Sequence, residues 1–396
     1  MALFAGRTVP QIPHHAYPQR WAAVQRLMRE AGLDLLIAYA DDRQTYGPAH
    51  ARWLADFPVM FEPVCILFRQ TGAPIMVCGP ESDEFARVRG RIADVRVLQE
   101  FTHPDEDYPF AVIQSLGDIL RESYGEIADI QRVGVAGKSL MNADLFAALQ
   151  ATLPGADWRD VDQQVCMLRA VKSPDEVAII RYAYQIAQAG MTAAIEAVGP
   201  GVTEREVAAA ADIAMRSMGA ESAAFDTMVV SGPSTRPIMG RSTFRVIQPG
   251  DLVVVTLAPR FEGYHAAIGR PMFIGHQDPE VRRAFEVARD AQLACAQALR
   301  PGIEGRSIDQ LGRKLVGEAG LGEYYLYTGL HSVGVIEFEP PIFSSHNPTV
   351  LEPGMIVSID IPLFNAPWGG LRVEDGFLIT EQGAERLHDT PYLIEK

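Results

Sequence analysis

Apolar positions alternate between helical and strand-like spacing through the first 165 residues. Helical spacing over 17–31, closed by Gly32, predicts a helix, and the short apolar run at 34–40 predicts a buried strand. Further strand-like runs lie at 64–68, 74–78 and 132–136. Further helical patterns lie near 81–90, 109–123 and 141–151. Strands that alternate with helices are typical of an α/β domain, so we assign residues 1–165 to a domain of this class.

A helix-start signal follows this first domain. Ser173 precedes Pro174 and is followed three residues later by Glu176, which is the pattern of a capping box, and the predicted helix runs to about Val198. A second helix is expected from Thr203. Later strand-like segments lie at 227–230, 251–257, 264–274, 355–363 and 371–380, and helical patterns lie near 279–300 and 307–319. Two helices followed by paired strands, twice over, predict a pseudo-symmetric α+β domain over residues 166–396.

Composition and charge narrow the class of protein. The chain is 48% hydrophobic and 21% charged, which excludes a disordered protein. Its 35 basic and 50 acidic residues give a net charge of −15, so we expect neither nucleic acid nor an anionic membrane as a partner. The chain shows no apolar leader and no apolar run long enough to span a membrane. Its four cysteines lie far apart without a CxxC pair, which favours a reducing, cytoplasmic setting.

Polar residues interrupt apolar segments at three places in the second half. His331 lies in a glycine-flanked loop, and Asp360 and Glu374 lie within strand-like runs. A carboxylate in a buried strand is costly unless it is paired, hydrogen-bonded or bound to a metal. A histidine and two acids on neighbouring strands can form either a metal site or an acid/base cluster. Alternatively, Asp360 ends its strand and Glu374 pairs with Arg372 at an edge.

These segments resemble the "pita-bread" superfamily of creatinases, prolidases, Xaa-Pro aminopeptidases and methionine aminopeptidases. The resemblance covers about residues 165–390 and implies a pita-bread catalytic domain. It includes the loop of the ligand histidine, the two strands that supply metal-binding glutamates, and the frame of a hairpin that carries two aspartates. The corresponding segments here are Leu330–Gly334 with Phe338–Pro341, Val350–Asp360, Gly370–Asp375, and Pro249–Asp251 with Gly263–Tyr264.

The departures from the family pattern concern the metal ligands and proton carriers. The two bridging aspartates of the peptidases fall on Thr256 and Ala267, which lack the charge that a hard dication needs. Two further family histidines fall on or near Met239 and on Phe338. We therefore expect no cofactor. A single divalent metal on His331, Asp360 and Glu374 remains the alternative, since three protein ligands suffice for a catalytic ion.

Three functional hypotheses follow. The first is a creatinase-like, metal-independent hydrolase of a C–N bond in a small molecule. The second is an Xaa-Pro-type metallopeptidase with a degenerate single-metal site, and the third is a non-catalytic protein that binds a ligand or peptide. In the first hypothesis His331, Glu374 and Asp360 are catalytic. The expected substrate-binding residues are His265, Tyr264, Arg236, Met239, Phe338, Thr256 and Glu62.

The resemblance also implies a homodimer in which the N-terminal domain of one subunit closes the pocket of the other. The stretch 52–62 is apolar and aromatic with few charges, as a buried interface requires.

Overall fold

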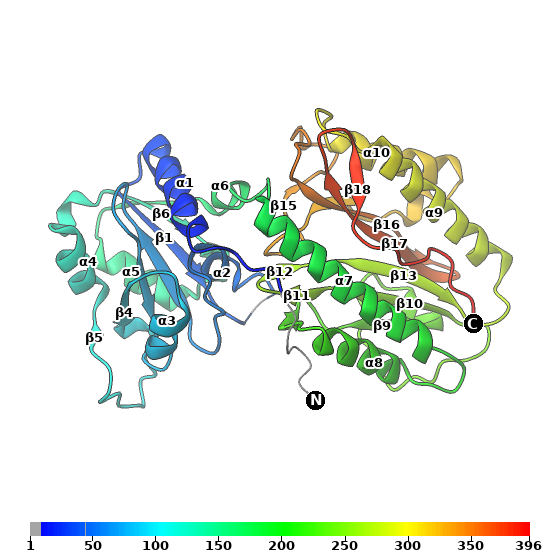
Figure 1. Cartoon of the computed structure of the whole chain (residues 1–396), viewed down its shortest axis with the longest axis horizontal. Helices are drawn as coiled ribbons and strands as arrows, with labels where there is room; N and C mark the ends of the chain where they lie inside the picture. Colours follow the sequence, from blue (N-terminus) through cyan, green and yellow to red (C-terminus); the bar gives the residue numbers. More distant parts are fainter. Residues whose placement is uncertain (1–8, 44) are drawn as a thin grey trace. The chain divides into compact units, whose positions relative to one another are not determined.

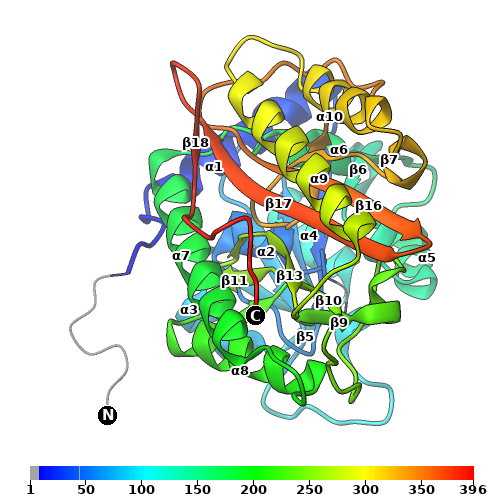
Figure 2. The same ribbon diagram turned by 90° about the vertical axis from the view of Figure 1, so that its right-hand side faces the viewer.

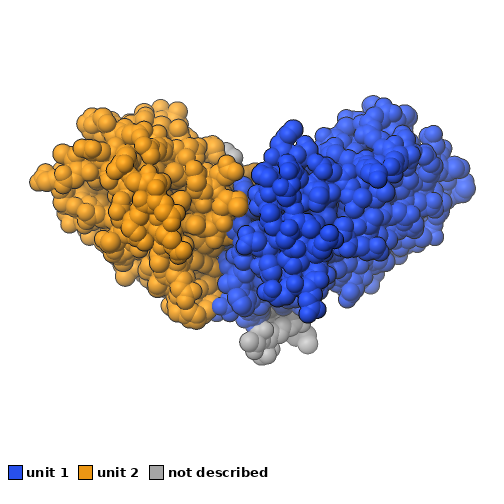
Figure 3. Space-filling model, turned by 90° about the horizontal axis from the view of Figure 1, so that it is seen from above, with its two compact units in different colours: residues 1–11, 170–396 blue, residues 12–169 orange. Residues whose placement is uncertain are grey.

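The computed structural model describes residues 9–43 and 45–396, and its described part divides into two compact units. Residues 12–169 form the N-terminal unit and residues 170–396 belong to the C-terminal unit (Figures 1 and 3). No helix in the described ranges is both long enough and apolar enough to cross a membrane.

The N-terminal unit is built on a mixed seven-stranded sheet with the strand order β5-β4-β3-β2-β1-β6-β7. Its strands are β1 (Leu35–Ala40), β2 (Val64–Phe68), β3 (Ile75–Cys78), β4 (Asp94–Leu98), β5 (Ile113–Gln114), β6 (Arg132–Ala136) and β7 (Asp157–Asp160). Its helices are α1 (Ala16–Ala31), α2 (Ala49–Ala55), α3 (Asp83–Arg89), α4 (Leu116–Tyr124), α5 (Ala143–Thr152) and α6 (Asp162–Met167). The predicted α/β class of this region is confirmed.

The helix predicted over 109–123 is only partly correct. The structure has the short strand β5 at Ile113–Gln114, and α4 begins after Ser115, whose hydroxyl accepts a hydrogen bond from the backbone N–H of Asp118. The serine therefore caps the helix seven residues later than the apolar spacing suggests.

The C-terminal unit contains an eight-stranded sheet with the order β15-β14-β16-β17-β13-β10-β9, and β18 pairs with β17. These strands are β9 (Met228–Ser231), β10 (Leu252–Leu257), β13 (Ile268–Phe273), β14 (Leu330–Ser332), β15 (Glu339–Ile342), β16 (Ile356–Ala366), β17 (Gly369–Ile379) and β18 (Ala384–Arg386). A three-stranded sheet is formed by β8 (Ser222–Ala223), β11 (Pro259–Phe261) and β12 (Tyr264–His265).

Four helices cover this unit, as Figures 1 and 2 show: α7 (Pro174–Ala197), α8 (Glu204–Ser217), α9 (Pro279–Ala298) and α10 (Arg306–Glu318). The capping box at the start of α7 is confirmed, because the Ser173 hydroxyl accepts from the Glu176 N–H while the Glu176 carboxylate accepts from the Ser173 N–H. Thr203 and Glu206 form the same motif at the start of α8. The predicted α+β class of this half is confirmed as well.

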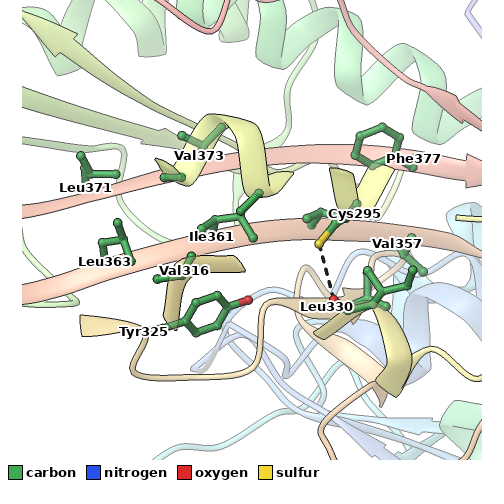
Figure 4. Close-up of a cluster of buried hydrophobic side chains, with 14 of the residues drawn as sticks. Cys295, Val316, Tyr325, Leu330, Val357, Ile361, Leu363, Leu371, Val373 and Phe377 are labelled. Carbon is green, nitrogen blue, oxygen red and sulfur yellow. Dashed lines mark hydrogen bonds between the residues drawn. The ribbon is translucent and has the colours of Figure 1, made fainter. Parts of the chain in front are cut away.

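Alternation along β16 separates an apolar face from a polar face. Val357, Ile361 and Leu363 pack with Cys295 of α9 and Val316 of α10 in the main hydrophobic core (Figure 4). Because successive side chains of a strand point to opposite faces, the intervening residues of β16 point away from these helices. The strand is therefore anchored on one side and presents polar side chains on the other.

The strand register places the predicted site residues in one row across the sheet. Asp360 of β16 pairs with Glu374 of β17, Glu374 pairs with Gly269 of β13, and Gly269 pairs with Thr256 of β10. On the other side of β16, His331 of β14 pairs with Ser358. Paired residues of neighbouring strands share a face, so the sheet itself brings these positions together.

Candidate metal centre

Three side chains converge at one end of this row. His331 of β14, Glu374 of β17 and Glu337, from the loop between β14 and β15, each offer one ligand atom, and these atoms all lie within 4.8 Å of one another. His331 and Glu374 are each 2% exposed, and Glu337 is 9% exposed. An imidazole nitrogen and two carboxylate oxygens form a donor set that a divalent ion accepts.

Hydrogen bonds orient two of the three ligands. His331 Nδ1 lies 3.0 Å from the carbonyl oxygen of Ser332, which can only accept, so in the neutral ring Nδ1 carries the proton. Nε2 is then the available ligand atom, and it lies 3.8 Å from Glu374 Oε1. The Ser358 hydroxyl donates to the same Glu374 oxygen over 3.0 Å. Such secondary contacts hold metal ligands in one orientation.

Asp360 is held by two other groups. The Tyr327 hydroxyl donates to Asp360 Oδ2 over 2.5 Å, and Arg372 Nη2 lies 3.4 Å from the same oxygen and donates to the Tyr327 hydroxyl. Arg372 Nη1 lies 3.8 Å from Glu374 Oε2. Asp360 Oδ1 and Arg372 Nε are buried without a hydrogen-bond partner among the described residues. Asp360 and Arg372 therefore offer one acceptor and one donor that the surrounding side chains leave unused.

Burial and mutual repulsion shift the acids of the site in different directions. Burial raises the pKa of Glu337 to about 7 and the pKa of Asp360 to about 6, and the charge of Glu374 acts in the same direction on both. Burial also opposes the charge of Glu374, but His331 and Arg372 outweigh it and lower the pKa of this residue. Burial alone would lower the pKa of His331, but Glu374 and Glu337 outweigh it and raise that pKa. The acids thus resist being charged together unless a cation lies among them.

The charge and chemistry of the site fit one divalent ion but not two. Fully ionised, the carboxylates of Glu337, Glu374 and Asp360 and the guanidinium of Arg372 sum to −3 + 1 = −2, which one dication balances. Further along the row, Thr256 and Gly269 bring no carboxylate that could bridge a second ion. The site has the donors of a single-ion centre.

Two predicted substrate-binding residues lie in β12. His265 is fully buried, and its Nδ1 lies 3.2 Å from the carbonyl oxygen of Gly334 in the loop that carries Glu337. The Tyr264 hydroxyl donates to the Glu176 carboxylate of α7 over 2.7 Å. These contacts give His265 a role in supporting the Glu337 loop and give Tyr264 one in packing β12 against α7.

The other predicted substrate-binding residues are dispersed. The Phe338 ring packs beside the His331 ring at a centroid distance of 4.3 Å. Arg236 is exposed and Met239 is 62% exposed, both in the segment between β9 and β10. Glu62 belongs to the N-terminal unit, where its carboxylate accepts from the backbone N–H groups of Glu81 and Ser82. Within its own unit Glu62 therefore stabilises the turn that leads into α3.

Comparison with known families agrees with this architecture. The model for "Metallopeptidase family M24" matches residues 178–381, and the "Creatinase/Prolidase N-terminal domain" matches residues 20–171. The chain belongs to metallopeptidase family M24. The predicted membership of the pita-bread superfamily and the two-domain pita-bread architecture are thus confirmed.

Curated relatives and solved structures of this family are similar over most of the chain. An Xaa-Pro dipeptidase of Pyrococcus furiosus is 35% identical over 292 residues, which covers 72% of this chain and 83% of the relative. An uncharacterized peptidase of Bacillus subtilis is 31% identical, and the match covers 71% of this chain and 78% of the relative. The crystal structure of the prolidase from Pyrococcus horikoshii OT3 superposes with a TM-score of 0.81 at 25% identity, covering 94% of this chain and 99% of the prolidase.

The prediction that the site has no metal and needs no cofactor is wrong. The family is one of metallopeptidases, and the similar proteins include Xaa-Pro dipeptidases. The prediction counted the two family aspartate positions, now Thr256 and Ala267, as lost ligands and did not consider another residue as a ligand. Glu337 is absent from the residues that the sequence predicts, although it directly precedes Phe338, the position where a family histidine is missing. The sequence signal that could have identified Glu337 is its position as an acid six residues after His331.

Proposed function

We propose that this protein is a metal-dependent hydrolase of peptide bonds in short peptides, and that dipeptides ending in proline are its first candidate substrates. A single divalent ion is held by His331, Glu337 and Glu374. The observation that carries the proposal is the convergence of these three ligand atoms within 4.8 Å in a buried site. The names of the similar Xaa-Pro dipeptidases support the substrate class. They favour this function over metal-independent, creatinase-like hydrolysis.

Each part of the site has a role in such a reaction. When bound, a divalent ion supplies Lewis acidity, which polarises a peptide carbonyl and lowers the pKa of a water molecule. Ser358 fixes the Glu374 carboxylate, and Ser332 fixes the tautomer of His331. The Phe338 ring covers one side of the His331 ring and keeps water from it. These contacts hold the ligands in place before substrate binds.

The unused polar atoms of Asp360 and Arg372 match the polar groups of such a dipeptide. Asp360 Oδ1 can accept a hydrogen bond and Arg372 Nε can donate one, and both are buried. Buried polar atoms are rarely left without a partner. A dipeptide ending in proline offers an N-terminal ammonium and a peptide C=O but no peptide N–H. We therefore assign Asp360 Oδ1 to the substrate ammonium and Arg372 Nε to the substrate carbonyl.

The experiment measures metal content and turnover together. Purified protein is loaded with manganese, cobalt or zinc, its metal is quantified by mass spectrometry, and it is assayed on Ala-Pro, Met-Pro and Ala-Ala. One equivalent of metal and chelator-sensitive cleavage of at least one peptide are expected. Glu337→Gln keeps the size of the side chain but removes its charge, and should weaken metal binding about 100-fold or more.

The exposed Glu352→Gln serves as a matched control, because Glu352 lies outside the cluster. Metal binding without turnover of any peptide would favour a protein that binds peptides without cleaving them. Wild-type metal affinity in Glu337→Gln would contradict the ligand assignment.

A further inference from the structure

The side chain of Tyr184 extends from helix α7 to the face of β17 that carries Glu374. Its ring fills the space beside Gly376, where an added Cβ atom would lie 2.6 Å from Tyr184 Cε1 and closer still to the hydroxyl oxygen. Gly376 follows Glu374 by two residues, so the two positions share one face of the strand. In the sheet register Gly376 pairs with Ser358, and Ser358 pairs with His331. The Tyr184 hydroxyl therefore lies on the side of the sheet that carries the metal ligands.

This hydroxyl has no hydrogen-bond partner among the described residues, although Tyr184 is fully buried. Burial raises the pKa of Tyr184 well above its usual value, and the charges of Glu374 and Glu337 act in the same direction. The backbone N–H of Ala267 acts in the opposite direction, but an N–H is itself a donor. The hydroxyl therefore keeps its hydrogen and finds no acceptor for it within the protein. Because buried donors are rarely left unpaired, we expect a bound molecule to supply the acceptor.

Two unused donors lie on either side of Glu374. Arg372 precedes Glu374 by two residues and Gly376, beside Tyr184, follows it by two, so both positions lie on the face of Glu374. When water adds to a peptide carbonyl, the carbon becomes tetrahedral and carries two oxygens. Arg372 Nε is assigned to the former carbonyl oxygen. The second oxygen, which comes from the water, matches the donor on the other side.

We propose that the Tyr184 hydroxyl donates a hydrogen bond to the oxygen that water contributes to the tetrahedral intermediate. The inference rests on the proposed function, because it concerns the same reaction. The water oxygen bonds to the carbonyl carbon, the C–N bond then breaks, and the two hydrogens of the water pass to the leaving nitrogen and to the new carboxyl group. Tyr184 keeps its own hydrogen throughout. A fixed donor of this kind is worth about 10²–10³-fold in kcat.

The test uses two unreactive analogues of Ala-Pro and the full-length, zinc-loaded protein. A phosphinate has a tetrahedral phosphorus with two oxygens in place of the carbonyl carbon, whereas a reduced analogue has CH2 there and carries neither oxygen. Tyr184→Phe removes one oxygen atom and should weaken phosphinate binding about 100-fold by calorimetry. Its affinity for the reduced analogue should stay unchanged. The kcat for Ala-Pro should fall by a similar factor, with little change in KM.

Two further variants separate this role from a structural one. Tyr182→Phe is the matched control, because Tyr182 lies on the same helix and its hydroxyl donates to the carbonyl oxygen of Met218 over 3.1 Å. It should leave both affinities unchanged. Gly376→Ala places a Cβ against Tyr184 and should weaken phosphinate binding as Tyr184→Phe does. Removal of an unpartnered hydroxyl loses no hydrogen bond, so metal-free Tyr184→Phe should melt at or above the temperature of the wild type.

The outcomes distinguish this inference from the proposed function. If folded Tyr184→Phe binds the phosphinate as the wild type does, the inference is overturned while the proposed function stands. If it binds both analogues equally more weakly, Tyr184 only shapes the site and the inference is overturned as well. If the wild type binds no zinc, the proposed function fails. Tighter phosphinate binding by that wild type than by Tyr184→Phe would still support the donor, and no binding by either protein would overturn both.

Discussion

The two faces of β17 carry two buried ionic clusters that differ in how completely their carboxylate oxygens are paired. On one face, Glu374 and its neighbour Asp360 contact a single guanidinium, and Asp360 Oδ1 has no partner among the described residues. On the other face, both carboxylate oxygens of Asp375 have partners. Glu374 and Asp375 are consecutive in the sequence, so the alternation of side chains along the strand is enough to place them on opposite faces.

The Asp375 cluster is a structural network. Oδ1 of this residue contacts the guanidinium of Arg270, Arg386 Nη2 at 3.2 Å and His388 Nε2 at 2.8 Å, while Oδ2 accepts from Gln292 of α9 over 2.7 Å. Burial by itself would raise the pKa of Asp375, but Arg270 and His388 outweigh it and hold the pKa far below its usual range. Asp375 is kept charged by its surroundings and therefore has a structural role.

The cluster around Glu374 has the opposite character. The pKa values of Glu337 and Asp360 are raised, mainly by burial, so the fold itself disfavours their charged forms. Groups of this kind gather at functional sites. The difference teaches that burial alone does not distinguish a structural ion cluster from a reactive one, whereas the pairing of the carboxylate oxygens does.

The largest expected effect tests this contrast by removing one charge from each face. Asp375→Asn leaves Arg270 and Arg386 facing a neutral group, and loss of one partner from a buried ion pair costs about 3–5 kcal/mol. Asp360→Asn removes a charge that the site disfavours, so it should cost less than about 1 kcal/mol. Urea unfolding in the presence of a chelator measures both free energies. Equal losses for the two variants would contradict the contrast.

How far the sequence predicts this site depends on whether a residue lies in a strand or a loop. Asp360 and Glu374 interrupt apolar strand-like runs, so the pattern identifies them directly. The family resemblance adds His331, which the pattern places in a loop and the structure places in β14. Glu337 lies in the loop before β15, and only the path of that loop brings its carboxylate to the other two ligands. Loop conformations depend on tertiary contacts that no local period reports.

The path of Arg372 is equally hidden in the sequence. The pattern suggests an edge pairing of Arg372 with Glu374, but the structure also directs the guanidinium to Asp360. The path of the guanidinium depends on Gly269, which pairs with Glu374 and lies on β13, about 100 residues earlier in the chain. The elements of both domains, by contrast, follow from periodicity and capping signals because those are local properties.

A smaller effect concerns the support beneath the Glu337 loop. Burial, with a contribution from Arg260, lowers the pKa of His265 from 6.5 to about 3. Below pH 6.5 the unfolded chain therefore binds a proton that the folded protein does not, and stability falls as the pH drops toward 3. The slope is about 1.4 kcal/mol per pH unit, which amounts to roughly 2 kcal/mol at pH 5.

His265→Gln should remove this part of the pH dependence, as measured by unfolding at pH 7 and pH 5. His346→Gln, at an exposed position, is the control. If the loss of stability between the two pH values is the same in His265→Gln and wild type, His265 is not the group that titrates. The Glu337 loop would then depend on other contacts.

The smallest expected effect extends the contrast between partnered and unpartnered groups to the surface of the N-terminal unit. Of the stretch 52–62 predicted to form a dimer interface, Trp53 and Leu54 are buried within their own fold. Met60 and Phe61 are 71% and 73% exposed. Phe61 has a φ of 67°, and its N–H donates to Asp42 over 2.7 Å. A strained and exposed aromatic residue held in place by a carboxylate suits an interface.

We propose that the protein is a homodimer and that Phe61 contributes to its interface. Light scattering at micromolar concentration should give the mass of a dimer. Phe61→Ser should raise the dissociation constant about tenfold, which corresponds to about 1.4 kcal/mol, because one exposed aromatic side chain loses its apolar contacts. Val88→Ser, at an 80% exposed position of α3, is a matched control that should leave the dissociation constant unchanged. A monomeric wild type would contradict the assignment, and a dimer equally weakened by both variants would place the interface around α3 instead.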